Sequence, residues 1–221
     1  MKTALRPASW LTALILTSIS GLAIAEPIAF TITDADTGAP VENAVVTLPG
    51  GEPPPPDEFS VVQKNRAFHP QVLVIPEGSR VNFPNEDNPQ HRVYSFSKAK
   101  SFDIELYADQ PKSPIHFDRA GIVELGCNIH DHMQGFILVT KRSLTGRTNA
   151  QGQFRVEQPT SDWEAPVKVR IWHPRLADTA QFIERSITPD SLQDASIQMS
   201  LEPAPKTDDE LDQLQQEFED L

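Results

Sequence analysis

The chain has 221 residues, and its formal net charge of −12 is expected to repel nucleic acid and anionic lipid, so neither is a predicted partner. Its 20 prolines against 10 glycines favour β-structure with many turns over long helices.

The first 25 residues have the pattern of a secretory signal peptide. Basic Lys2 and Arg6 precede an apolar run from Trp10 to Leu22, and the Ala-Ile-Ala sequence at 23–25 matches an A-x-A cleavage site. The run is shorter than the ~20 residues that a membrane-spanning helix needs. We therefore expect cleavage after Ala25 and a mature chain in a bacterial periplasm, with a charge of −14 because two basic residues and no acid are removed.

Segments at both ends of the mature chain predict one small β-sandwich. Residues 29–34 and 44–48 read as two strands joined as a hairpin, with a turn signal at 36–38. Three more strands are expected at 153–156, 167–172 and 195–201. These three strands cannot close a core alone, so we expect the hairpin to complete their sheet and the region between to be an insertion.

The region from 61 to 140 predicts a second β-structure. Its short strands recur between Pro and Gly turns, which is typical of an antiparallel sandwich or barrel. The expected strands are 71–75, 80–83, 92–96, 102–106, 115–117, 122–125 and 135–139. The odd positions of 123–127 share one face with the apolar residues, so the thiol of Cys127 is expected to point inward.

The chain therefore divides into five predicted segments. They are a signal peptide (1–25), the first part of the flanking β-sandwich with a proline-rich linker (26–58), the inserted β-domain (59–141), the remainder of the flanking sandwich (142–203) and an acidic tail (204–221). In the tail, Thr207 and Glu210 form a capping box ahead of an apolar stripe. The sequence leaves two interpretations of the tail open, an amphipathic helix and a disordered segment.

The stretch GCNIHDHM, at 126–133, contains the only cysteine of the chain. A lone cysteine in an oxidising compartment cannot form an intramolecular disulfide. His130 and Met133 follow Cys127 at +3 and +6, so one loop offers thiolate, imidazole and thioether. A trigonal His₂Cys site with a weak axial Met describes an electron-transfer copper centre, and His91 is the candidate for the second imidazole.

Other interpretations of Cys127 stay open. The thiol could be inert in a core, or bridge two molecules. Zinc also binds Cys and His, but structural zinc sites usually carry more than one thiolate and do not use methionine. A nucleophilic cysteine needs a base and an oxyanion device, which no local motif supplies. Two further alternatives are a carboxylate ligand, from Glu86 or Asp87, and His132 as ligand in place of His130. Both acids are expected to be surface charges of their loop.

Four parts of the sequence resemble the cupredoxins, the small copper proteins with a Greek-key fold. They are Phe83-Pro-Asn85, His91, the 117–121 segment and the 126–133 loop, and the resemblance covers about 61–140. The short loop is similar to that of amicyanin-like and plastocyanin-like proteins, often labelled methylamine-utilisation proteins. The resemblance implies an all-β Greek-key barrel or sandwich.

The same resemblance implies one type 1 copper, with His91, Cys127 and His130 as equatorial ligands and Met133 as the axial ligand. The flanks resemble split halves of a carboxypeptidase-regulatory-like, transthyretin-type β-sandwich, through 36–41 and 149–154.

Two positions depart from the cupredoxin pattern. Many cupredoxins carry asparagine after the first ligand histidine, where this chain has Arg92, and His132 directly precedes Met133. The backbone N–H of Arg92 could still donate to the Cys127 sulfur. The other three histidines are expected to be structural or exposed: His69, His116 and His173.

The resemblance implies an electron carrier and not an enzyme, since protein side chains would fill all ligand positions. The acidic chain favours a redox partner with a basic docking patch. The alternatives are a copper-handling or sensing protein and an adhesion or scaffold module.

Overall fold

The structure is a computed structural model that describes residues 28–50, 54–129, 132–141, 143–156, 166–192 and 194–204. Within these ranges the regular secondary structure is β-strand, apart from one single-turn helix, α1 (Pro189–Leu192). The strands are β1 (Ile28–Asp34), β2 (Val45–Pro49), β3 (Glu58–Ser60), β4 (Val62–Lys64), β5 (Ala67–His69), β6 (Val72–Pro76), β7 (Ser79–Asn82), β8 (His91–Phe96), β9 (Ser101–Tyr107), β10 (Ile115–Phe117), β11 (Gly121–Cys127), β12 (Gln134–Thr140), β13 (Ser143–Arg147), β14 (Gln153–Val156), β15 (Val167–Trp172), β16 (Ile183–Ile187) and β17 (Ser196–Met199).

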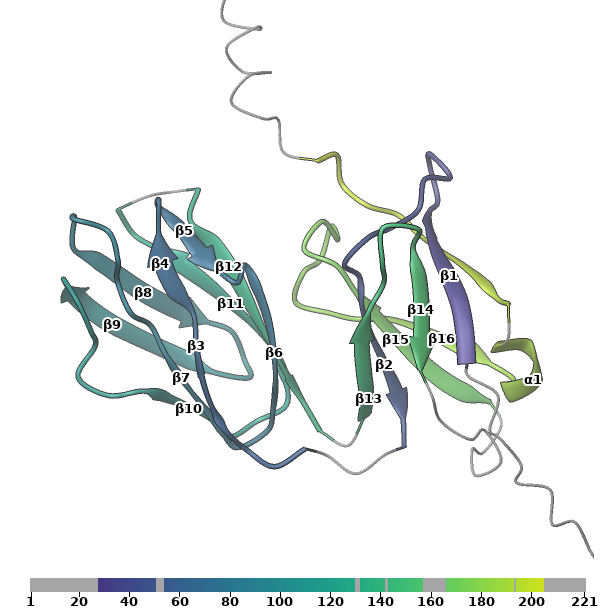
Figure 1. Ribbon diagram of the computed structural model, residues 1–221, viewed down its shortest axis with the longest axis horizontal. Helices are drawn as coiled ribbons and strands as arrows, with labels where there is room; N and C mark the ends of the chain where they lie inside the picture. Colours follow the sequence, from purple (N-terminus) through teal and green to yellow (C-terminus); the bar gives the residue numbers. More distant parts are fainter. Residues whose placement is uncertain are drawn as a thin grey trace, which may run out of the picture.

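The strands form two lobes that lie side by side in Figure 1. The central lobe holds β3 to β12, in a five-stranded sheet of order β6-β12-β11-β8-β9, a three-stranded sheet of order β10-β7-β3 and the β4-β5 hairpin. The flanking lobe holds β1, β2 and β13 to β17, in sheets of order β14-β1-β17 and β13-β2-β15-β16. The predicted all-β sandwich class is confirmed, and the described strands form open sheets that do not close into a barrel.

The predicted hairpin between the first two strands is wrong. The turn at 36–38 does form, because the Asp34 carboxylate accepts the backbone N–H groups of Asp36 and Thr37 and Gly38 takes a φ of 72°. The chain then crosses to the opposite sheet, so β1 pairs with β14 and β17 whereas β2 pairs with β13 and β15. The unbroken burial of Val45 to Leu48 reflects this central position in a second sheet.

The expected strands at 153–156, 167–172 and 195–201 are present as β14, β15 and β17, and those of the 71–139 region as β6 to β12. The boundaries of the five predicted segments stay predictions. The predicted signal peptide and all but the first residue of the predicted tail lie outside the described residues. In the described part of the chain, no helix is long and apolar enough to cross a membrane.

Strand β12 packs against both lobes, because one of its faces is buried in the central lobe and the other against the flanking lobe. Ile137 and Val139 point into the central lobe, whereas Phe136 and Leu138 pack with the apolar residues of the flanking lobe. The Phe136 ring meets Trp172 of β15 edge to face, with 4.9 Å between the ring centroids. The two lobes therefore share one apolar cluster, and burial of its aromatic area stabilises their contact.

Candidate metal centre

Strands β8 and β11 bring His91 and Cys127 together. The two strands are antiparallel neighbours in which Cys127 lies opposite Val93. Along β8 the buried positions alternate, so His91 and Val93 share the inner face. On β11 the residues Val123, Leu125 and Cys127 are all buried in the core of the central lobe, which confirms the expected inward direction of the thiol.

The imidazole of His91 and the thiol of Cys127 face each other. The distance from Nδ1 of His91 to Sγ of Cys127 is 3.6 Å, and the two residues are 0% and 4% exposed. A metal ion that binds sulfur at about 2.3 Å and nitrogen at about 2.0 Å holds the two atoms roughly 3.5 Å apart at a tetrahedral angle. The observed separation therefore fits two ligands of one ion. Burial of the thiol also keeps it from a substrate, which disfavours a nucleophilic role.

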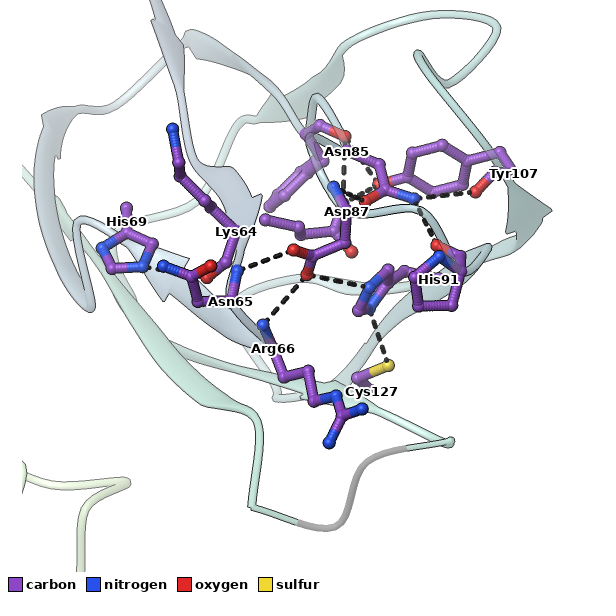
Figure 2. A network of polar contacts seen from close by, with 12 residues as sticks. Lys64, Asn65, Arg66, His69, Asn85, Asp87, His91, Tyr107 and Cys127 are labelled. Atoms are coloured by element: carbon purple, nitrogen blue, oxygen red, sulfur yellow. Dashed lines mark hydrogen bonds and ion pairs between the residues drawn. The ribbon is translucent and has the colours of Figure 1, made fainter.

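The second imidazole nitrogen faces a carboxylate. Figure 2 shows Asp87 between His91 and the turn that joins β4 to β5, and Oδ2 of Asp87 lies 3.2 Å from Nε2 of His91. The carboxylate also accepts the backbone N–H groups of Asn65, at 2.7 Å, and of Arg66, at 2.9 Å. Burial raises the pKa of Asp87, but these backbone hydrogen bonds and His91 outweigh it and hold the pKa below its usual range.

A charged carboxylate can only accept, so its position 3.2 Å from Nε2 favours the tautomer with the proton on that nitrogen, although the contact falls short of hydrogen-bond geometry. The lone pair of Nδ1 then points toward Cys127, as a metal ligand requires.

The loop that carries Asp87 is held by Asn85 and Tyr107. The side-chain amide of Asn85 donates to the carbonyl of Pro89 at 2.9 Å, and its oxygen accepts the N–H of Asp87 at 3.0 Å. The Tyr107 hydroxyl donates to the carbonyl of Phe83 at 2.6 Å, and burial raises the pKa of Tyr107 to about 12. This network fixes the direction of the carboxylate before any ligand binds.

The predicted ligands differ in how far the structure describes them. Met133 is 2% exposed and lies in the same apolar cluster as Cys127, whereas His132 is exposed. His130 lies outside the described residues. Across the described ranges, no three His, Cys, Asp or Glu side chains converge as a group that could hold a metal ion. The complete ligand set therefore stays a prediction. Of the four predicted ligands, the structure brings His91 and Cys127 into direct contact.

The expectation that both acids of the 84–90 loop are surface charges is wrong for one of them. Glu86 is exposed and pairs with Lys64 at 2.9 Å. The side chain of Asp87 is only 13% exposed, because it turns inward to His91. No sequence signal marks this inward direction, because the acid lies in a loop that has neither strand nor helix periodicity.

The remaining polar positions lie away from the thiol. Arg92 directs its guanidinium to Asp103 in a two-point ion pair. The ring of His69 contacts the carbonyl of Lys64 at 3.1 Å, and His116 is exposed on β10. His173 is buried beside β15 in the flanking lobe.

No family model matches the chain, and no curated protein matches it either. Among solved structures, cupredoxins and related copper proteins are similar to about 40% of it. A copper-containing nitrite reductase from Thermus scotoductus SA-01 is 26% identical over 41% of this chain, with a TM-score of 0.36. The match spans only 24% of the length of that reductase.

Two smaller proteins align over nearly their whole length. A purple cupredoxin from Nitrosopumilus maritimus is 20% identical over 37% of this chain and 99% of its own, with a TM-score of 0.32. A reduced Cu(I) form of an amicyanin variant is 18% identical over 43% of this chain and 98% of its own, with a TM-score of 0.35.

Proposed function

We propose that this chain is a periplasmic type 1 copper protein that transfers electrons between redox partners. The observation that carries the proposal is the buried contact between Nδ1 of His91 and Sγ of Cys127. A buried thiol and a buried imidazole that face each other match the strongest donors of such a centre, where the thiol would bind as thiolate.

The proposed ligands are His91, Cys127 and His130, with Met133 as the weak axial donor. Copper would supply a one-electron cycle between Cu(II) and Cu(I). The chain itself would keep the donor atoms in place, because β8 and β11 are paired and the 84–90 loop is fixed by hydrogen bonds. A site that holds its ligands in both oxidation states needs little rearrangement for each electron.

No enzymatic activity is proposed, because protein side chains would fill all four ligand positions. Electrons would leave through the edge of His130, next to Ile129, which is 44% exposed. The net charge of −14 expected for the mature chain favours a partner with a basic docking patch and makes the association sensitive to salt. A copper-handling role is the second candidate, since the exposed His132 adds a further donor to the loop.

The first experiment is the absorption spectrum of the purified protein loaded with Cu(II). We expect an intense visible band from thiolate-to-copper charge transfer, and its complete loss in Cys127→Ser. His116→Ala, an exposed histidine on β10, serves as the control and should keep the band. A wild-type protein that stays colourless and binds Cu(I) in preference would contradict electron transfer and favour copper handling.

The choice between His130 and His132 can be tested on the same band. His132→Ala is expected to leave the band intact, whereas His130→Ala should bleach or strongly shift it. The opposite result for the two histidine variants would reassign the ligand.

The axial ligand is tested by Met133→Leu. This variant should keep the colour and raise the reduction potential, because loss of a thioether donor destabilises Cu(II) more than Cu(I). Loss of all copper binding in Met133→Leu would show that this methionine is not a weak axial donor.

A further inference from the structure

The Asp87 carboxylate has an unusual set of partners for a loop residue. It joins three separate segments: the 65–66 turn, the 84–90 loop and the start of β8. Figure 2 shows this bridge from the turn through Asp87 to His91 and on to Cys127.

Both turn residues adopt left-handed backbone conformations, with φ of 53° at Asn65 and 57° at Arg66. The arginine is unusual there, because this type of two-residue hairpin turn favours glycine at its second position. The strained turn directs two successive N–H groups at one carboxylate. Such paired donors hold an anion in a fixed orientation.

The two carboxylate oxygens of Asp87 have different partners. Oδ1 accepts the N–H of Asn65, and Oδ2 accepts the N–H of Arg66 and faces Nε2 of His91. Since the turn fixes the carboxylate in place, Oδ2 presents a preset acceptor to the ring. This arrangement favours the tautomer that carries its proton on Nε2 and exposes Nδ1 toward the thiol, at a contact of 3.2 Å that is short of hydrogen-bond geometry.

We infer that Asp87 is a positioning residue for the metal centre: through the 65–66 turn it fixes the tautomer and the orientation of His91 and strengthens Nδ1 as a donor. This inference rests on the proposed function for its metal-bound part. The effect on the tautomer, however, belongs to the metal-free chain and can be measured without copper. Partners of this kind behind a ligand histidine typically change metal affinity by about 10- to 100-fold.

Asp87→Ala tests the inference directly, with Glu86→Ala as the matched control. Glu86 is the neighbouring acid on the same loop and pairs with exposed Lys64, so its removal changes the charge equally and leaves the contact between Asp87 and His91 in place. In metal-free protein labelled with ¹⁵N-histidine, NMR should find the Nε2–H tautomer of His91 in wild type and in Glu86→Ala. A mixture with the Nδ1–H tautomer is expected in Asp87→Ala. Cu(II) affinity should fall about 10- to 100-fold in Asp87→Ala only.

Asp87→Asn decides the case if Asp87→Ala does not fold. An amide keeps one oxygen but places an NH₂ group on the other side, so it cannot accept from Asn65, Arg66 and His91 together. We expect its Cu(II) affinity to fall below that of Glu86→Gln. Equal affinities in these two variants, or an unchanged tautomer in a folded Asp87→Ala, would overturn the inference. Failure of wild type to bind copper would instead overturn the proposed function and leave the tautomer result standing.

Discussion

Replacing Trp172 with alanine is expected to lower the free energy of unfolding by about 3–5 kcal/mol, the usual cost of deleting a large buried aromatic side chain. Trp172 is 0% exposed, packs edge to face on Phe136 and donates from Nε1 to the carbonyl of Thr179 at 2.8 Å. The substitution leaves a cavity between the lobes and an unpaired carbonyl. Chemical denaturation followed by circular dichroism measures the loss.

Phe96→Ala is the matched control, because Phe96 is also a large aromatic side chain but is 80% exposed. Its cost should stay within about 0.5 kcal/mol. A double-mutant cycle of Trp172→Ala and Phe136→Ala should reveal a coupling of about 0.5–1.5 kcal/mol from the ring pair. If Trp172→Ala costs no more than Phe96→Ala, the lobes do not share a tightly packed core.

The sequence predicted most strands because their buried faces follow a period of two. It missed three edge strands, β3, β13 and β16, of which β16 has low burial along its whole length. It also missed the β4-β5 hairpin, whose turn carries Arg66 where glycine is expected. It also paired β1 with β2, because a turn signal between two apolar runs is the usual mark of a hairpin. Only the three-dimensional pairing shows that the chain crosses between sheets there.

At the site, sequence spacing was informative within one loop and weak between loops. Cys127 could be oriented from the alternation along β11, and His91 could be proposed from its place after a loop. The inward direction of Asp87 could not be derived, because it depends on the Asn65 and Arg66 N–H groups, about 20 residues earlier in the chain. Every residue except proline has a backbone N–H, so the residue types at 65 and 66 do not show that they contact Asp87. From the sequence alone, Asp87 is therefore predicted to be a surface charge.

Acidification is expected to destabilise the fold through His173. The residue is 9% exposed, and burial, followed by the nearby Arg175, lowers its pKa from 6.5 to about 4, although a backbone contact with Glu42 opposes the shift. The ring is therefore neutral in the folded chain, and its Nδ1 accepts the N–H of Arg175 at 3.2 Å. Unfolding exposes the ring, which then takes up a proton below pH 6.5.

The sign follows from this difference in proton uptake. Stability from His173 is complete above pH 6.5 and falls as the pH drops toward 4, where the loss reaches at most about 3 kcal/mol. His173→Gln keeps an oxygen that can accept from Arg175 but cannot be protonated, so its stability should fall less over the same range. His116→Gln, at an exposed position, should follow wild type. Since the carboxylates titrate alike in all three proteins, equal slopes for wild type and His173→Gln would mean that the folded chain protonates His173 as readily as the unfolded chain does.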